Sequence, residues 1–355
     1  MDPQKDLLSY SVVIATRNRP AALALSIPLL QGQSRAPAEI IVIDASDDPG
    51  PSREIVEGLA RTLGADIRFV RAARKGISFQ RNQGLALVRA PVVLLPDDDS
   101  LFLPKAAAEI LAVYERDREG LVGGVCGREV RTAPEGVLET ATYRERRGDT
   151  LRRWLFRAQI RFERRFFPDP FLSVADAKYR ALTPPPWLEP DRHALVETMT
   201  GFRMSFRTEV LRAIGGFDET LGSYSLGEDV DASLRVLDSH VLVGALQAEV
   251  FHYKDPSARD TGFGLGVIQI LNRAYIVAKN TGLAPHPRKV FLRFARYKCA
   301  QYAAGALVRR SAFSRDRAHG ARAALRHVPA LFEAAPSEVE TRYQELRAAL
   351  LPPAS

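Results

Sequence analysis

Four short runs of mostly apolar residues in the first quarter of the chain constrain its fold most. They are rich in Val and Ile, and segments of helical composition separate them. Strands that are apolar on both faces are typical of a parallel sheet covered by helices. We therefore predict an α/β fold with a mostly parallel central sheet. The predicted strands cover residues 10–15, 39–44, 67–70 and 92–95, and the predicted helices cover residues 20–30, 52–63 and 78–88.

Polar residues follow three of these predicted strands. Thr16 follows the first, Asp44 ends the second, and Asp97, Asp98 and Asp99 follow the fourth. In open parallel sheets, ligands bind beyond the carboxyl ends of the strands. We therefore expect these side chains to share one rim of the sheet.

The three successive carboxylates require a compensating charge. Two carboxylates about 4 Å apart repel by roughly 4 kcal/mol at an effective dielectric constant near 20. Oxygen ligands suit Mg²⁺ or Mn²⁺, and Mg²⁺ is usually held by one or two carboxylates together with substrate phosphates. Asp97–Asp99 thus indicates a metal-diphosphate site. The alternative is a solvated turn whose Asp residues cap a helix that begins after Pro104.

Two other nucleotide-binding patterns are absent from the sequence. No Gly-x-Gly-x-x-Gly follows the first predicted strand, and no Gly-Lys-Ser/Thr of the Walker type occurs. Both a dinucleotide-binding fold and a P-loop are therefore disfavoured.

The positive charge is concentrated in two segments. The net charge of the chain is +8, whereas residues 144–165 carry +6 and residues 288–327 carry +10, which leaves −8 for the remainder. Apolar residues recur at helical spacing in both segments, so we expect basic amphipathic helices. Each has two interpretations: a solvated Arg face on a core helix, or peripheral contact with an anionic membrane. Such local charge does not indicate a nucleic-acid partner.

Cysteine content and hydropathy indicate the cellular compartment in which the protein acts. Cys126 and Cys299 lie far apart and have no metal-ligand spacing, which favours a reducing environment. The first residues lack a signal-peptide pattern, and no stretch has the roughly 20 apolar residues of a spanning helix. We expect a cytoplasmic protein, either soluble or peripheral on the cytoplasmic face of a membrane.

The second half of the chain holds a further acidic cluster and a candidate histidine. Glu228, Asp229 and Asp231 open a predicted helix, where acidic residues also suit the helix dipole without any catalytic role. His252 lies at the end of a predicted strand at residues 248–253, which follows another at 240–246. Its role as a structural residue or a metal ligand is open at this level.

With these residues in hand, the sequence resembles the family 2 glycosyltransferases of the GT-A fold over about residues 10–255. No single motif is specific, but their order along the chain is. The motifs are residues 12–19, residues 40–44, Gly76 with residues 81–84, Asp97–Asp99, residues 204–207 with 215–218, and residues 227–231.

The resemblance implies roles for individual residues. Asp99 would coordinate Mg²⁺ or Mn²⁺, with Asp97 and His252 as further ligands. Asp229 would be the catalytic base, with Glu228 beside it holding the acceptor or a loop. The implied donor-binding residues are Thr16, Arg17, Asp44, Gly76, Arg81, Asn82, Asp97 and Asp98.

The resemblance also implies an organisation and a reaction. Residues 8–132 would form the donor-binding half, 133–197 a basic helical insertion, 198–255 the acceptor and catalytic half, and 256–355 a helical C-terminal region. The enzyme would move a sugar, with inversion, from a nucleoside-diphosphate sugar to a hydroxyl of a glycan or lipid-linked acceptor. Two alternatives remain. A nucleotidyltransferase should carry a Gly-rich loop after the first strand, and a non-catalytic scaffold should lack Asp99 or Asp229.

Overall fold

The computed structural model describes residues 7–137, 159–222, 226–253 and 261–351. Its contacts divide the chain into two compact units. The first combines residues 1–142 with 178–258, and the second combines residues 143–177 with 259–355. We describe each unit by itself.

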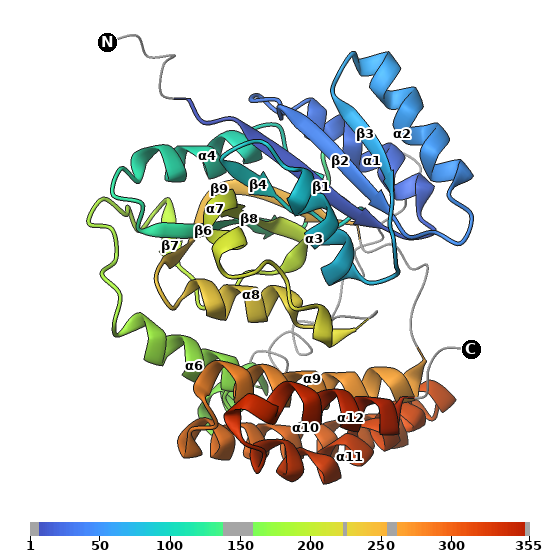
Figure 1. Ribbon diagram of the computed structural model, residues 1–355, viewed down its shortest axis with the longest axis vertical. Coiled ribbons are helices and arrows are strands. Elements are labelled where there is room, and N and C mark those ends of the chain that lie inside the picture. Colours follow the sequence, from blue (N-terminus) through green and yellow to red (C-terminus); the bar gives the residue numbers. More distant parts are fainter. Residues whose placement is uncertain (1–6, 138–158, 223–225, 254–260, 352–355) are drawn as a thin grey trace. The chain divides into compact units, whose positions relative to one another are not determined.

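The first unit is built on a nine-stranded sheet (Figure 1). Its order is β3-β2-β1-β4-β8-β6-β9-β5, and β7 also pairs with β9. Strands β3, β2, β1 and β4 are parallel, β8 runs antiparallel to both β4 and β6, and β6 is parallel to β9. The predicted α/β class is confirmed. The strands are β1 (Tyr10–Thr16), β2 (Glu39–Asp44), β3 (Ile67–Arg71), β4 (Val92–Leu94), β5 (Ser100–Phe102), β6 (Val122–Val130), β7 (His193–Leu195), β8 (Met204–Arg207) and β9 (Val241–His252).

Alternating side chains of the parallel strands pack on opposite faces of the sheet. Val12 and Ile14 of β1 join the main core cluster, to which the first, second and fourth helices contribute. Val13 points to the other face, where a Cβ on Gly84 would lie 2.3 Å from its Cγ1. Only glycine lets the third helix approach β1 this closely. The helices of this unit are α1 (Pro20–Gln31), α2 (Gly50–Leu63), α3 (Ile77–Leu87), α4 (Ala106–Arg116), α7 (Thr208–Ala213), α8 (Glu228–Val236) and the 3-10 helices η1 (Gly201–Arg203) and η2 (Glu219–Leu221).

The sequence analysis missed strand β5 and divided β9 in two. Ser100 of β5 pairs with His252 of β9 in an antiparallel ladder, so the three Asp residues lead into a strand. Helix α4 begins later, and its N-cap is Lys105, without a side-chain capping bond. The helix-capping interpretation of Asp97–Asp99 is therefore wrong. Strand β5 has only three residues and pairs with a segment about 150 residues later, so the local sequence gives little indication of it.

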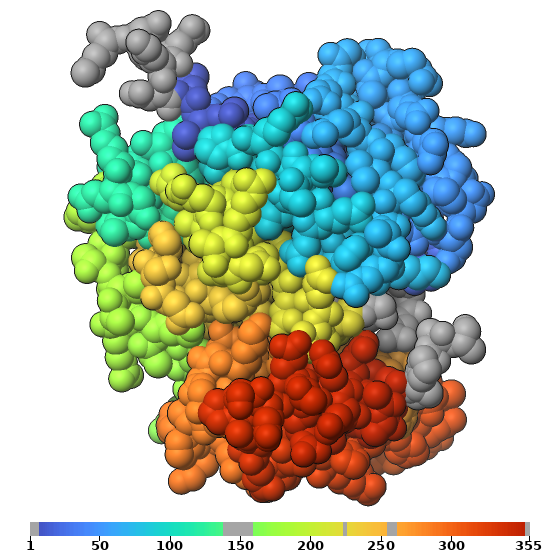
Figure 2. Space-filling view, in the orientation of Figure 1, coloured from blue at the N-terminus to red at the C-terminus, as the bar shows by residue number. Residues whose placement is uncertain are grey.

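The second unit is helical, and its C-terminal part is the orange to red region of the space-filling view (Figure 2). Helices α9 and α11 pack with their backbones in close approach, because a Cβ on Gly266 would lie 2.1 Å from the carbonyl oxygen of Arg317. Of the predicted basic helical segment at residues 144–165, residues 159–165 are helical and residues 144–158 lie outside the described residues. The helices are α9 (Gly262–Thr281), α10 (Pro285–Arg309), α11 (Ala312–Phe332), η3 (Pro336–Glu338) and α12 (Val339–Leu350), with α6 (Pro170–Tyr179) beginning in this unit.

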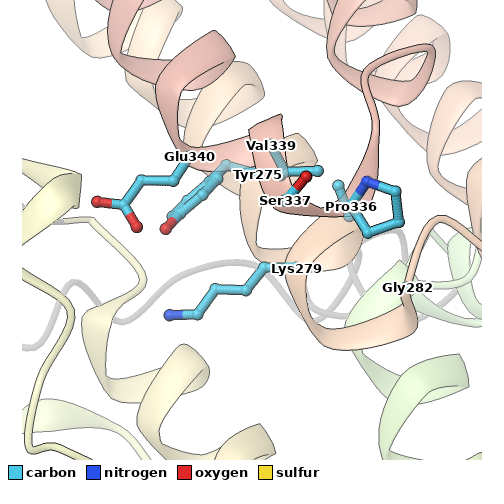
Figure 3. A pocket seen from close by; sticks show the side chains of 8 residues that line it. Tyr275, Lys279, Gly282, Pro336, Ser337, Val339 and Glu340 are labelled. Atoms are coloured by element: carbon cyan, nitrogen blue, oxygen red, sulfur yellow. The ribbon is translucent and has the colours of Figure 1, made fainter.

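A shallow pocket lies on the second unit between α9 and the start of α12 (Figure 3). Its polar side chains include Tyr275, Lys279 and Glu340, and Pro336 of η3 lines one side. Among the described helices, none combines the length and the apolar composition that a membrane span requires.

Glu39 provides a test of how β2 is held in the sheet. Its carboxylate is buried and accepts hydrogen bonds from the Ser11 hydroxyl at 2.6 Å and the Arg89 backbone amide at 2.9 Å, and it pairs with Arg68. Burial alone would raise the pKa of Glu39, but these bonds lower it overall. A lowered pKa stabilises the fold above the unfolded-state pKa, and that stability is lost as the pH falls through the folded-state pKa.

We expect Glu39→Gln to lower the unfolding free energy by about 1–3 kcal/mol at neutral pH. The difference from wild type should shrink as the pH falls below the ordinary range for Glu. Denaturant unfolding at several pH values measures both effects. Glu57→Gln, at an exposed position of α2, is the matched control and should have little effect. A pH-independent difference would contradict the proposed electrostatic origin.

Candidate active site

The rim formed by β1 and β4 brings the first polar groups together. Ala15 and Asp97 form an isolated parallel bridge just beyond the paired ends of these two strands. The Thr16 hydroxyl donates a hydrogen bond of 2.7 Å to Asp98 Oδ2. Arg19 lies 3.2 Å from Asp98 Oδ1 and 3.6 Å from Asp99 Oδ2. The loop after β1 therefore supplies both a hydroxyl and a cation to the carboxylates.

Asp97, Asp99 and His252 form a candidate metal site. One ligand atom from each lies within 4.8 Å of the others, and His252 Nε2 is 3.2 Å from Asp99 Oδ1. The imidazole stacks on Phe202, with 4.5 Å between ring centroids and 13° between planes. Two carboxylate oxygens and one imidazole nitrogen are a donor set that fits Mn²⁺, and also Mg²⁺ with its preference for oxygen.

The electrostatics of the carboxylates also fit a cation. Burial raises the pKa of Asp98 to about 7, although Arg19 and Thr16 act in the opposite direction. Burial likewise raises the pKa of Asp97, with a further contribution from the charge of Asp99. Ionising these groups together is costly without a positive charge beside them. A divalent cation at Asp97 and Asp99 would remove that cost.

Arg81 of α3 connects the candidate metal site to the acidic cluster of α8. Its side chain is 1% exposed; Nη2 donates to Asp97 Oδ1 at 2.8 Å, and Nη1 donates to Glu228 Oε1 at 2.7 Å. The guanidinium also lies over the ring of Phe217, 5.4 Å from its centroid. A buried arginine thus fixes the distance between two carboxylates that are far apart in the sequence.

The start of α8 orients Glu228 and Asp229 differently. The helix follows Gly227, which has φ of 99°, a conformation that favours glycine. Glu228 is buried, and burial together with the charge of Asp229 raises its pKa to about 8. Asp229 is half-buried, and its Oδ2 accepts a 2.8 Å hydrogen bond from the backbone amide of Gly201. Glu228 is therefore paired with Arg81, whereas Asp229 retains a partly exposed carboxylate.

The second strand end holds Asp44 next to this rim. Asp44 is fully buried and accepts hydrogen bonds from the amide and hydroxyl of Ser46, at 2.6 and 2.9 Å. Arg71 Nη1 is 3.2 Å from Asp44 Oδ1 and also donates to the Ser46 carbonyl. Gln80 ties the ends of β1 and β2 together through the carbonyls of Thr16 and Ile43.

Three of the predicted donor-binding residues lie outside this network. Arg17 is exposed and lies 3.4 Å from Asp47. Gly76 is the N-cap of α3, with φ of 143°. Asn82 exchanges hydrogen bonds with the backbone of Phe217, accepting from its amide and donating to its carbonyl, both at 2.8 Å. In this structure Asn82 thus fastens α3 to the loop before η2.

Four residues of the site were not singled out from the sequence. Arg19 follows Thr16 in the first motif, so its charge beside three carboxylates was a signal that could have been used. Phe202 was visible only as an aromatic residue in an unassigned segment. The contacts of Arg71 and Gln80 depend on which strands are neighbours, and short-range patterns carry no sign of them.

The comparisons with known proteins agree with this geometry. The sequence model of glycosyl transferase family 2 matches residues 11–170. This stretch is therefore similar to glycosyl transferase family 2. The expected resemblance to this family is thereby confirmed over residues 11–170, which include β1 to β4 and Asp97–Asp99. No curated protein matches the chain significantly.

Solved structures of three glycosyltransferases share the fold. GalNAc-T7 with UDP, GalNAc and Mn²⁺ is 15% identical with a TM-score of 0.53, over 78% of this chain and 48% of that one. This chain thus spans about half of GalNAc-T7. The mannosyltransferase PcManGT from Pyrobaculum calidifontis, with GDP-Man and Mn²⁺, is 15% identical with a TM-score of 0.52, over 96% and 86%. S. aureus TarS 1–349 with UDP-GlcNAc is 14% identical with a TM-score of 0.53, over 96% and 91%. At these identities the likeness shows the GT-A fold.

Arg81 offers a test of the coupling within the site. Removing one partner of a buried ion pair typically costs 3–5 kcal/mol, because the other charge is left uncompensated. We expect Arg81→Met to lower the unfolding free energy by about that much. At a pH above 8, where Glu228 is ionised, adding Glu228→Gln should recover part of the loss, because the double variant no longer buries that second charge. Denaturant unfolding of the double-mutant cycle measures the coupling.

The control for Arg81→Met is Arg61→Met, at an exposed position of α2, which should change the unfolding free energy little. Strict additivity of Arg81→Met and Glu228→Gln would show that the two side chains are not coupled.

Proposed function

We propose that the chain is an inverting, metal-dependent glycosyltransferase that uses a nucleoside-diphosphate sugar. The observation that carries the proposal is the convergence of Asp97, Asp99 and His252 at the rim of the family 2 domain. Three neighbours with the same fold were crystallised with UDP or GDP compounds, two of them with Mn²⁺.

The donor would lie along the ends of β1, β2 and β4. Asp44, Thr16 and Arg17 would contact the nucleoside. Asp98, which accepts a hydrogen bond from Thr16, would line the same side of the donor site. Asp97, Asp99 and His252 would hold Mn²⁺ or Mg²⁺, which when bound neutralises the diphosphate leaving group. Arg81 holds Asp97 in position, and it would lie near the diphosphate end of the donor. Gly76 and Asn82 set the start of α3 and its loop, and we propose that they shape the donor pocket.

Asp229 is our candidate for the general base. Its half-buried carboxylate can accept the proton of an acceptor hydroxyl. The Gly201 amide donates to Oδ2 and so holds the carboxylate in position. Single displacement by that hydroxyl breaks the bond from the anomeric carbon to the diphosphate and inverts the anomeric centre. Glu228 holds Arg81, so its part is to position the loop and the acceptor side of the site.

The acceptor would be a hydroxyl group of a glycan or of a lipid-linked sugar. The chain would act in the cytoplasm or at the cytoplasmic face of a membrane. The two basic segments at residues 144–165 and 288–327 remain our candidates for contact with anionic lipid, and part of the first lies outside the described residues.

Nucleotide titration tests the donor site. We expect one of UDP, GDP and TDP to bind in the presence of Mn²⁺ and to lose most of its affinity with chelator, as measured by calorimetry. Loss of groups that only support metal ligands costs about 10–100-fold in metal affinity, so Asp99→Asn should cost at least about 10-fold. Asp191→Asn, at an exposed position of the same unit, is the control. Binding of none of the nucleotides would favour the scaffold alternative, and metal-independent binding would contradict the proposed metal site.

The base assignment is tested by comparing Asp229→Asn with Glu228→Gln. A well-placed general base contributes about 10²–10⁴ in rate, so Asp229→Asn should lose that much in kcat while nucleotide binding is kept. Glu228→Gln should act mainly on stability and acceptor KM, because Glu228 pairs with Arg81. Release of nucleoside diphosphate, with water or a screened glycan as acceptor, is the readout. Near-full turnover by Asp229→Asn would overturn the mechanism, and product retaining the donor's anomeric configuration would overturn inversion.

A further inference from the structure

The end of α10 and the start of α11 form an exposed tip at residues 307–315 (helices labelled in Figure 1). The buried residues of α10 are Phe291, Phe294, Ala295 and Cys299, so the helix continues for about three turns beyond its last buried side chain. In α11 the first buried residue is Gly320. Residues 307–313 of this connection are exposed, whereas the backbone of Phe313 packs against Gly262 at the start of α9.

The tip carries large apolar side chains in solvent. Leu307 is 78% exposed and Val308 is 83% exposed, the two highest values among the exposed large hydrophobic residues of the described chain. Phe313, the second residue of the next helix, is 44% exposed. Apolar side chains grouped at one exposed site mark a contact surface, because their hydration is unfavourable.

Basic residues surround this apolar group. Arg309 and Arg310 follow Val308 directly, and Arg315 lies beyond Phe313. Asp316 is the acidic residue of the tip, so residues 307–316 keep a net charge of +2. Within the described residues, no carboxylate lies within 4 Å of the guanidinium groups of these three arginines. Their charge is therefore available to an external anion.

The turn itself is well defined. Arg310 closes α10 in the left-handed region, with φ of 50°. The Ser311 hydroxyl caps α11 by accepting from the Ser314 amide at 3.2 Å, and Arg315 donates to the Arg310 carbonyl at 3.2 Å. These bonds hold the apolar and basic groups on one short stretch of chain.

We propose that this tip inserts into an anionic lipid bilayer. Leu307, Val308 and Phe313 would enter the boundary between headgroups and acyl chains, and Arg309, Arg310 and Arg315 would lie at the lipid phosphates. Apolar burial and attraction to anionic lipid are the two forces that bind peripheral proteins to membranes. The proposed lipid contact is thus limited to one site within the basic segment at residues 288–327. This proposal does not depend on the donor chemistry.

Flotation with vesicles tests the proposal on the full chain. Wild type should bind vesicles of phosphatidylcholine with phosphatidylglycerol and not vesicles of phosphatidylcholine alone. Arg309→Gln/Arg310→Gln should lower partitioning by about 30-fold, because each basic residue near the surface contributes about 1 kcal/mol. Leu307→Ser/Val308→Ser should lower it by at least about 10-fold through lost apolar burial.

Matched controls separate the tip from general charge and hydropathy. Arg61→Gln/Arg118→Gln changes the net charge equally at exposed positions of the first unit, and Leu63→Ser/Leu87→Ser removes two partly exposed leucines there. Both should bind as wild type does. The emission of Leu307→Trp should shift to the blue with anionic vesicles, whereas that of Leu63→Trp should not shift.

Three outcomes would overturn the proposal: equal vesicle binding by wild type and both tip variants, no emission shift for Leu307→Trp, or self-association that only the tip variants abolish, which would identify a second copy as the occupant. Metal-dependent nucleotide binding should be the same in wild type and in the tip variants. Failure of the nucleotide titration therefore bears on the proposed function, and failure of flotation bears on the tip alone.

Discussion

The candidate site depends on the buried guanidinium of Arg81. It lies between Asp97, which follows β4, and Glu228, which opens α8, and it contacts both at less than 3 Å. Without a cation there, the buried Glu228 and the partly buried Asp97 would have to ionise in a medium that disfavours their charge. Because arginine stays protonated and presents a planar set of donors, it can bridge two acids with fixed geometry. The relative position of the candidate metal site and the start of α8 follows from this bridge.

The rest of the site is arranged around the same balance of charge. Arg19 compensates Asp98 and Asp99 from the loop after β1, and Arg71 compensates Asp44 from β3. The carboxylates that keep raised pKa values are Asp97, Asp98 and Glu228, despite these cations. The arginines of the protein thus compensate part of the negative charge at the site, and the rest can be compensated by a bound cation. A metal with a diphosphate-bearing donor is a chemically consistent way to complete it.

The two units use opposite distributions of polar and apolar groups. In the first unit, charged side chains are buried and paired at the rim of the sheet. In the second unit, the close approach of α9 and α11 at Gly266 and Gly320 makes a compact helical core, whereas apolar Leu307 and Val308 are left in solvent among arginines. Buried charge fits catalysis on an anionic substrate, and exposed apolar residues among cations fit a lipid surface.

The sequence by itself determined the α/β class, because continuous apolar runs such as residues 40–43 and 92–95 are typical of strands buried on both faces of a parallel sheet. It also determined that Thr16, Asp44 and Asp97–Asp99 follow strands, since strand ends are local features. The tertiary structure decided which of these groups meet. Antiparallel pairing of Ser100 with His252 brings the histidine to Asp99, and Arg81 joins Asp97 to Glu228 across 131 positions of sequence. Such pairings are set by strand order and packing, which depend on contacts between distant segments and leave no periodic trace in the chain.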